Sequence, residues 1–209
     1  MAIRQNGMHG WRALMKRLMD MSMSAGCLLV LSPLLAVVAL AIKITSRGPV
    51  FFRQQRVGKG GRLFWMYKFR SMYADAEERL KSVLPLNQAS GPIFKIRNDP
   101  RITPLGNILR RASIDELPQL WNVLKGEMSL VGPRPPLSRE VREYGPRECR
   151  RLEVKPGITC LWQVSGRSEL SFQRWVELDL RYIEHQSLLL DMAILARTPL
   201  AVISTKGAY

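Results

Sequence analysis

The sequence predicts an α+β protein in which an N-terminal membrane helix precedes a compact, mainly helical domain. Three observations support this fold class: an uncharged apolar run over 21–42, two strand-like segments around a glycine-rich loop at 58–61, and helical spacing of apolar residues in several later segments. We expect residues 1–47 to form an N-terminal arm and a membrane helix. Residues 48–209 should then form one domain with a small β-hairpin and interfacial amphipathic helices.

Composition limits the partners of the chain. It has 209 residues and a formal net charge of +15, which favours polyanionic partners such as nucleic acid, anionic lipid or phosphorylated substrates. Its length is sufficient for one domain with a buried core. The cysteines Cys27, Cys149 and Cys160 are odd in number and lack metal-binding spacing, so we expect free thiols in a reducing compartment.

The apolar run from Met21 to Ile42 is long enough to cross a bilayer core. It exceeds the apolar part of a signal peptide, and Lys43 and Arg47 follow it in place of a small-residue cleavage site. A buried core helix is the weaker alternative, because so long a run without charge is typical of membrane segments. We therefore predict a membrane helix.

A bend is expected near the middle of this run, at Ser32-Pro33, because proline removes one helical hydrogen bond and its ring crowds the preceding turn. The backbone groups that Pro33 frees must be satisfied by Ser32 or by a neighbouring helix. Both flanks are basic, with Lys16 and Arg17 before the run and Lys43 after it. A re-entrant helix keeps both flanks in the cytoplasm, in agreement with the positive-inside rule, and is favoured over a kinked spanning helix.

A β-hairpin is predicted after the membrane segment. Val50–Arg53 and Leu63–Phe69 have the apolar and aromatic content of strands. Gly58–Gly61 between them lacks the spacing of a phosphate-binding loop and has no helix after it, which favours a turn. Next, Ala74–Leu84 is predicted to form a charged amphipathic helix and Leu86–Pro100 a loop.

Two helices are predicted on either side of Ser113. The segment 103–111 has helical spacing, and a second helix should extend over about 115–125 and end at a glycine. Ser113 and Glu116 have the spacing of a capping box, so Glu116 has two interpretations, a helix cap and a functional carboxylate. Asp115 is not needed for such a cap, which favours a functional role.

The last part of the chain combines turns and helices. The segments 154–159 and 164–167 are rich in turn-forming residues. Phe172–Ile183 has the spacing of a helix with a charged face, and Leu188–Ile203 is apolar but interrupted by Pro199. We expect Leu188–Ile203 to pack on the core or to lie along the membrane interface.

The residues around Asp115 and Glu116 indicate a site that handles phosphate. Arg110 and Arg111 precede the pair and Arg134 follows it, and the planar guanidinium fork matches phosphate oxygens. Carboxylates among such charges should stay ionised. They are then able to bind a divalent metal or to attack an electrophile.

Several short motifs follow one another along nearly the whole chain. They are Lys16-Arg17-Leu18-Met19-Asp20, Ser32-Pro33, Tyr67-Lys68-Phe69-Arg70-Ser71-Met72, Arg110-x-x-Ser113-x-Asp115-Glu116-Leu117-Pro118-Gln119, Asn122-Val123-Leu124-Lys125-Gly126, Val131-Gly132-Pro133-Arg134-Pro135, Lys155-Pro156-Gly157-Ile158-Thr159 and Trp162-Gln163-Val164-Ser165-Gly166-Arg167. Together these motifs are highly specific. On them the chain resembles the monotopic bacterial phosphoglycosyl transferases, the bacterial sugar transferase family.

The resemblance implies a re-entrant helix broken at Ser32-Pro33 and a reaction that moves sugar 1-phosphate from a UDP-sugar to undecaprenyl phosphate, with release of UMP. Asp115 matches the family's nucleophile, which attacks the phosphorus bearing the sugar to give a covalent aspartyl phosphosugar. The resemblance also implies Mg²⁺ as the cofactor, at Asp115 and Glu116. Glu116 is expected to assist with the metal or with positioning.

Other residues match family positions that are expected to bind phosphate or substrate. They are Lys68, Arg70, Arg110, Arg134, Arg167 and Asp179. The helical pattern around Asp179 suggests a charged face exposed to solvent, but the family match implies a functional role for this residue. The resemblance further implies a monotopic protein of the bacterial inner membrane, in contact with lipids of the cytoplasmic leaflet and without a nucleic-acid partner. Residues 48–209 would be the cytoplasmic catalytic domain, and an interfacial apolar surface would allow a homodimer.

The implied role is the first membrane step of exopolysaccharide, O-antigen or glycoprotein glycan assembly, in a catalytic unit without the extra N-terminal helices of larger relatives. Cys160 stands where the family has glycine, a residue that permits positive φ or close approach of a substrate. Two other functions stay open. A membrane-tethered basic binding module would account for the charge but not for the acidic pair. A metal-dependent phosphohydrolase would use water as the acceptor, and His9 and His185 are too far in sequence from the acidic pair to favour histidine chemistry.

Overall fold

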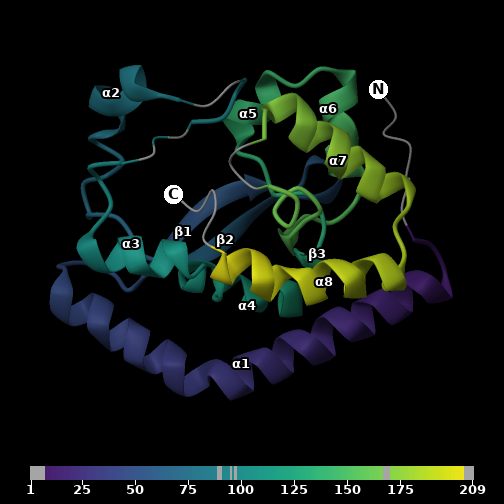
Figure 1. Cartoon of the computed structure of the whole chain (residues 1–209), viewed down its shortest axis with the longest axis horizontal. Helices are drawn as coiled ribbons and strands as arrows, with labels where there is room; N and C mark the ends of the chain where they lie inside the picture. The colour runs from purple at the N-terminus through teal and green to yellow at the C-terminus, as the bar shows by residue number, and fades with distance from the viewer. Residues whose placement is uncertain (1–7, 89–90, 95, 97, 167–169, 205–209) are drawn as a thin grey trace.

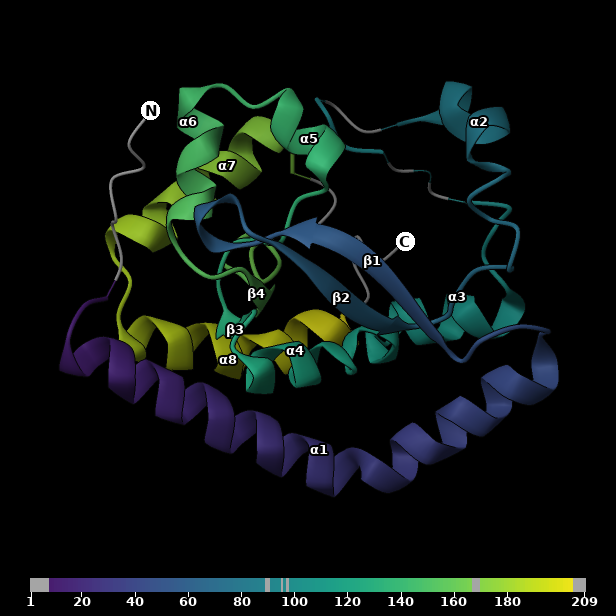
Figure 2. The same ribbon diagram turned by 180° about the vertical axis from the view of Figure 1, so that it is seen from behind.

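The computed structural model describes residues 8–204 except 89–90, 95, 97 and 167–169, and it has the α+β architecture expected from the sequence. The long helix α1 (Trp11–Thr45) lies beneath a domain of shorter helices and two two-stranded sheets (Figure 1). Three helices form the layer of this domain next to α1 (Figures 1 and 2). They are α3 (Pro104–Arg111), α4 (Gln119–Lys125) and α8 (Leu188–Ile203).

Helix α1 bends near its middle, as the Ser32-Pro33 pair predicts (Figure 2). Pro33 has no N–H to donate to the Leu29 carbonyl, and the Ser32 hydroxyl donates to that oxygen instead, at 2.8 Å. Only 11% of the apolar stretch of α1 is buried, which rules out a core helix, and its length and composition suit a membrane segment. The bend itself is compatible with both a re-entrant and a kinked spanning helix.

The first half of α1 is attached to the domain by buried polar contacts. Lys16 Nζ lies 2.6 Å from Asp191 Oδ2 on α8, and Asp20 accepts a hydrogen bond from Ser129 Oγ at 2.8 Å. The Arg17 guanidinium donates to the carbonyls at the end of α4, which carry partial negative charge. These contacts fix the position of the apolar helix relative to α4 and α8.

Strands β1 (Phe51–Val57) and β2 (Leu63–Phe69) form the predicted antiparallel hairpin, with their first and last residues opposite each other. The glycine-rich segment between them is a tight turn. Its 3₁₀ part covers Lys59–Gly61, where Gly60 and Gly61 have φ of 67° and 81°. These left-handed conformations explain why glycine is used there.

A second, parallel pair of strands was missed by the sequence analysis, which predicted only turns around 154–159. It consists of β3 (Ser129–Val131) and β4 (Gly157–Thr159). Strands of three residues carry too little hydrophobic pattern to be recognised. The pair forms because two backbones approach closely at Gly132 and Gly157, and a Cβ atom on Gly157 would collide with the Gly132 nitrogen.

The helix predicted for Ala74–Leu84 is wrong over most of its length, because only α2 (Leu80–Val83) is α-helical there. Arg101 Nη1 donates to the Ala76 carbonyl at 3.2 Å. In a continuous helix that carbonyl would accept from Leu80 N, which bonds to a different carbonyl in the structure. A distant arginine therefore takes the acceptor that the helix would need.

The remaining helices either match the prediction or have no counterpart in it. α3 and α7 (Phe172–Glu184) match, and each begins after a hydroxyl residue, Thr103 or Ser171, that accepts a backbone N–H. α4 begins four residues later than predicted but ends at a left-handed glycine as expected. The unpredicted elements are α5 (Ser138–Arg142), α6 (Pro146–Cys149) and the 3₁₀ turns Leu84–Leu86 and Arg150–Glu153.

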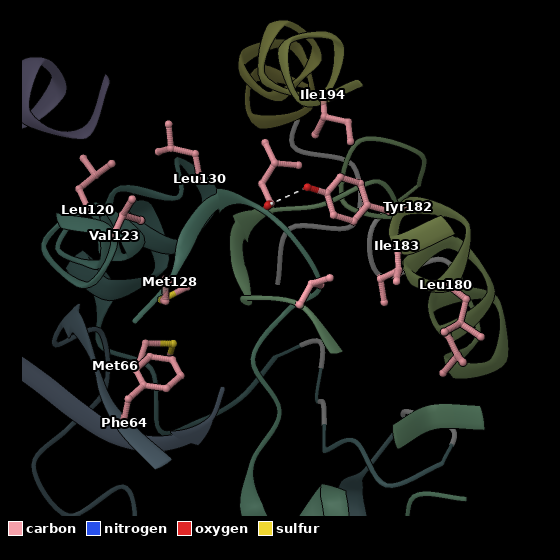
Figure 3. Packing of buried hydrophobic residues seen from close by; sticks show 13 residues of the cluster. Phe64, Met66, Leu120, Val123, Met128, Leu130, Leu180, Tyr182, Ile183 and Ile194 are labelled. Carbon is pink, nitrogen blue, oxygen red and sulfur yellow. Dashed lines mark hydrogen bonds between the residues drawn. The ribbon is translucent and has the colours of Figure 1, made fainter. Parts of the chain in front are cut away.

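The main hydrophobic core lies between the hairpin, α4, the β3–β4 pair, α7 and α8 (Figure 3). Tyr182 of α7 is 1% exposed, and its hydroxyl donates to the Val131 carbonyl of β3 at 3.0 Å. The core thus holds β2 and β3 in place, and the candidate site is built at the ends of these two strands. Its members are Phe64, Met66, Leu120, Val123, Met128, Leu130, Val131, Val154, Val176, Leu180, Tyr182, Ile183 and Ile194.

Candidate active site

Asp115 lies in a short 3₁₀ turn, Ile114–Glu116, between α3 and α4. The turn follows Ser113, whose φ of 54° makes it the one non-glycine residue with positive φ in the described part of the chain. This conformation is disfavoured by about 1–2 kcal/mol for a residue with a Cβ atom, and such strain is typical of functional sites. It redirects the chain so that the Asp115 side chain is buried, with the residue 5% exposed, against a cavity.

Glu116 binds Lys68 and does not cap a helix. Its Oε1 accepts a hydrogen bond from Lys68 Nζ at 2.6 Å, whereas Ser113 makes no side-chain cap. Helix α4 begins only at Gln119. The capping-box interpretation of Glu116 is therefore wrong, and the ion pair connects the acidic pair to strand β2.

Two arginines that the sequence assigned to phosphate binding line the same cavity as Asp115. Arg110 lies in the last turn of α3, and its Nε donates to Ser71 Oγ at 2.9 Å. Helix α3 approaches residue 71 closely because Gly106 has no side chain, and a Cβ atom there would collide with the Ser71 carbonyl. Arg134 is exposed in the loop after β3.

The two neighbouring carboxylates have opposite pKa shifts. Burial raises the pKa of Asp115 to about 6, although the charges of Lys68 and Arg110 act against this shift. For Glu116 burial also acts to raise the pKa, but Lys68, Arg134 and Arg110 together lower it below its usual value. Asp115 is thus the more basic carboxylate, ionised at neutral pH and suited to nucleophilic attack.

Most of the predicted substrate-binding residues lie along one cavity of about 780 Å³. It extends from the start of β1, past the end of β2, to the segment 134–144. Its many basic side chains and its size suit a phosphorylated small molecule. The predicted residues along its wall are Lys68, Arg70, Arg110, Asp115 and Arg134.

Asp179 does not line this cavity. It is fully buried in α7, and its Oδ2 accepts a hydrogen bond from Arg151 Nε at 2.9 Å, while Arg151 does line the cavity. Burial raises the pKa of Asp179 to about 6, and the Arg151 charge opposes that shift. The structure therefore places Asp179 behind Arg151, where it positions this arginine. Arg167 lies outside the described residues.

Several polar residues of the cavity wall were not identified from the sequence, among them Arg56, Ser71 and Arg151. Arg56 of β1 is 6% exposed, and burial, followed by the charge of Arg134, lowers its pKa to about 10. Arg151 is oriented by a carboxylate far away in sequence, so no local pattern could indicate it. Ser71 accepts a hydrogen bond from Arg110 of α3. Because Ser71 belongs to the same sequence motif as Lys68, that motif could have identified it.

Cys160 does not strain the backbone. It has no positive φ, so the position does not need glycine's conformational freedom. The residue is 2% exposed and packs with Trp162, Trp175 and Leu178, and the two indole rings stack with centroids 4.0 Å apart. The cysteine thus acts as a small buried hydrophobic residue, and all three cysteines are free.

A magnesium ion at the acidic pair would depend on substrate for most of its ligands. Mg²⁺ commonly binds one or two carboxylates together with phosphate oxygens and water. Asp115 lines the cavity, whereas Glu116 does not and uses Oε1 to bind Lys68. The described residues contain no group of three or more His, Cys, Asp or Glu side chains able to hold a metal, so phosphate and water would have to supply the remaining ligands.

Two known proteins with similar sequences are named as phosphotransferases of undecaprenyl phosphate. The undecaprenyl-phosphate galactose phosphotransferase of Salmonella typhimurium is 45% identical over 204 residues, which cover 93% of this chain and 42% of that protein. The undecaprenyl-phosphate glucose phosphotransferase of Komagataeibacter xylinus is 45% identical over 210 residues, which cover 95% of this chain and 38% of that protein. The chain therefore spans less than half the length of these two relatives.

A shorter relative matches over most of both chains. The exopolysaccharide production protein ExoY of Rhizobium meliloti is 37% identical over 198 residues, which cover 93% of this chain and 88% of that protein. The family model described as bacterial sugar transferase matches residues 11–205, a range that includes α1 and every element of the site. The chain belongs to the bacterial sugar transferase family.

Proposed function

We propose that this chain transfers a sugar 1-phosphate from a UDP-sugar to undecaprenyl phosphate and releases UMP, as the first membrane step of exopolysaccharide or related glycan assembly. The observation that carries this proposal is the buried Asp115 in a cavity with Lys68, Arg110 and Arg134 along its wall. A nucleophile surrounded by cations suits a reaction in which one polyanion replaces another at phosphorus. The names of the two phosphotransferase relatives support the same acceptor.

The proposed transfer consists of two displacements at one phosphorus atom. In the first, a carboxylate oxygen of Asp115 bonds to the phosphorus that bears the sugar, and the bond from this phosphorus to the UMP oxygen breaks, so UMP leaves with the electron pair. In the second, an oxygen of the lipid phosphate attacks the same phosphorus and the bond to Asp115 breaks. The carboxylate is regenerated, and the two substrates use the nucleophile in turn.

Cationic side chains offset the repulsion between an anionic nucleophile and an anionic phosphate. Lys68 and Arg110 act on Asp115 directly, since both lower its pKa. Arg134 is exposed at the cavity wall, where its guanidinium is able to bind phosphate oxygens in a bidentate manner. Mg²⁺ held by Asp115 and Glu116 would neutralise further phosphate charge when bound.

The test is a UMP-release assay over a panel of UDP-sugars, with Mg²⁺ and with or without undecaprenyl phosphate. Donor labelled in its sugar phosphate should release UMP, and the label should appear in the lipid fraction only when undecaprenyl phosphate is present. Label that ends in water at the same rate without the lipid would indicate a phosphohydrolase. A protein that releases no UMP from any donor would be a binding module.

Replacement of Arg134 by alanine should lower kcat/KM for transfer by about 10²-fold, because a donor aimed at the transferred phosphoryl group is lost. Steady-state kinetics with labelled donor measures this change. Arg147→Ala is the matched control, since Arg147 is exposed on α6 and does not line the Asp115 cavity. Equal activity of the Arg134 variant and the control would reassign Arg134 to a structural role.

We also propose that α1 is re-entrant in the bacterial inner membrane, with the rest of the described chain on the cytoplasmic face. Two contacts support this topology, because they attach the two ends of α1 to the same domain. Near the start of the helix, Lys16 pairs with Asp191, and at its end Ser46 accepts hydrogen bonds from Arg70. A domain on one side of the bilayer cannot hold both ends of a spanning helix.

Cysteine labelling tests this topology in intact cells. Single cysteines placed by Arg12→Cys and Arg47→Cys, in a chain whose three native cysteines are replaced, lie on opposite flanks of the apolar run. Both should be protected from a membrane-impermeant maleimide in intact spheroplasts and should react after lysis. Labelling of one flank before lysis would establish a spanning helix.

A further inference from the structure

Arg70 lies where the cavity meets the end of α1. It directly follows β2, and its Nη2 donates to Ser46 Oγ at 2.7 Å and to the Ser46 carbonyl at 2.9 Å. Ser46 is the residue that ends α1. Because Arg70 also lines the cavity that contains Asp115, one guanidinium connects the apolar helix with the candidate active site.

The other donors of Arg70 have no partner. Nε and Nη1 are buried without a hydrogen bond, no carboxylate in the described part of the chain forms an ion pair with this side chain, and the residue is only 6% exposed. Among the other buried arginines along the cavity, Arg101 pairs with Asp99 at 2.6 Å and Arg151 with Asp179 at 2.9 Å. Arg56 has no carboxylate partner among the described residues, but both of its terminal nitrogens donate, to the Pro135 carbonyl and to Gln54. Burial of a guanidinium without a counterion is unfavourable, and a bound anion would offset this cost.

The position of this guanidinium is constrained by its surroundings. Gly48 has a φ of 120° and lies so close that a Cβ atom on it would collide with Arg70 Nη1. The backbone N–H of Arg70 donates to the Val50 carbonyl at 2.9 Å. Arg70 is therefore held in place between Ser46 and Gly48, with Nε and Nη1 left without a hydrogen bond.

The cavity wall near Arg70 includes exposed apolar side chains, and Arg101 also lines it next to Tyr73. Phe51 and Tyr73 are 53% and 42% exposed, and Met72 lies between Arg70 and Tyr73 in the chain and lines the same wall. The opposite end, around residues 134–144, is rich in arginine and contains a tyrosine. One end thus suits an apolar chain with an anionic head, and the other suits a polar nucleotide.

We propose that Arg70 anchors the phosphate of the lipid acceptor, an isoprenyl phosphate whose first isoprene units contact Phe51, Met72 and Tyr73. The sugar nucleotide then binds toward the 134–144 end. This inference rests on the proposed function and assigns its second substrate to a defined part of the site. A lipid embedded in the bilayer presents its phosphate at the interface, and Arg70 is bonded directly to the end of the membrane helix.

A binding measurement that does not depend on catalysis tests the proposal. Calorimetric titration of the detergent-solubilised full chain with farnesyl phosphate should show at least about tenfold tighter binding than titration with farnesol, because an anion–guanidinium hydrogen bond is added. Arg70→Gln should remove this difference, and Arg70→Lys should keep part of it. Arg47→Gln, which removes an exposed charge two residues before Pro49 and outside the cavity, should keep all of it.

Two results would overturn the proposal: equal binding of farnesyl phosphate and farnesol by the unaltered chain, or unchanged phosphate preference in Arg70→Gln. The comparison of farnesyl phosphate with farnesol uses only the unaltered chain, so the proposal can be tested even if Arg70→Gln does not fold. The covalent mechanism is judged separately, by whether label from the UDP-sugar stays on the protein without lipid. If Arg70→Gln loses the phosphate preference but the unaltered protein retains no label, the acceptor site is supported and the aspartyl intermediate is contradicted.

Discussion

Asp115→Asn should reduce transfer by at least about 10³-fold and should abolish the covalent adduct. The amide has nearly the shape of the carboxylate but lacks the anionic oxygen that must bond to phosphorus. The measurement uses a UDP-sugar labelled in the sugar phosphate, incubated without lipid, followed by denaturation and counting of the label that stays on the protein. A fraction of the unaltered protein should be labelled with release of an equal amount of UMP, and the variant should show neither.

Stability measurements separate this chemical effect from misfolding. Since the pKa of Asp115 is raised from 3.8 to about 6 in the folded protein, the ionised carboxylate disfavours the folded state, and its effect grows as the pH rises from 4 to 6. Asp115→Asn removes this effect. The variant should therefore unfold at a higher temperature than the unaltered chain at pH 7.5, and the difference should shrink toward pH 4.

The control for Asp115→Asn is Asp75→Asn, which changes an exposed carboxylate that pairs only with Arg79 at the surface. It should transfer sugar phosphate at the normal rate. Near-normal turnover by Asp115→Asn would remove Asp115 from the nucleophile role. Lower stability of that variant at pH 7.5 would contradict the pKa argument, because loss of a disfavoured charge should not destabilise the fold.

Lys68→Met should lower transfer by about 10²-fold and should shift its dependence on pH. Lys68 donates to Glu116 at 2.6 Å and lowers the pKa of both carboxylates of the pair. Activity of the unaltered chain should rise with pH through about 6, as Asp115 ionises. Without the Lys68 charge the pKa of Asp115 must rise, so the rising part of the pH–rate profile should move to higher pH.

A surface ion pair provides the matched control for Lys68. Lys125 donates to Glu127 at 2.7 Å, a geometry like that of the Lys68–Glu116 pair, but its side chain is 41% exposed and lies outside the cavity. Lys125→Met should leave both the rate and the pH profile unchanged, since exposed ion pairs contribute little. A pH profile of Lys68→Met that coincides with that of the unaltered chain would show that Lys68 does not act on Asp115.

Elements with strong local signals were predicted correctly. The apolar run and Ser32-Pro33 indicated a long, bent apolar helix, because absence of charge and loss of one N–H are properties of neighbouring residues. The hairpin and α7 followed from strand content and helical spacing in the same way, whereas Leu188–Ile203, expected to be interrupted at Pro199, is one continuous helix. The motif residues from Lys68 to Arg134 identified several charged residues of the cavity wall, although their distances could not be known in advance.

Long-range contacts account for the errors. Ala74–Leu84 has the pattern of a helix, but Arg101 binds the Ala76 carbonyl and interrupts it. The strands Ser129–Val131 and Gly157–Thr159 exist only because they pair with each other. Glu116 had a plausible local partner in Ser113, yet a lysine on β2, far away in sequence, is the group that binds it.

The sequence by itself determined the apolar helix, its bend, the positive charge and the identity of the acidic pair, because each depends on residue types within a few positions of one another. Only the tertiary structure decided which partners these residues meet. It placed Lys68 on Glu116, Asp179 behind Arg151, and Arg70 at the end of α1 with donors left unpaired. The physical reason is that burial, pKa and ion pairing depend on groups brought together by packing of the core, and no local pattern records those distances.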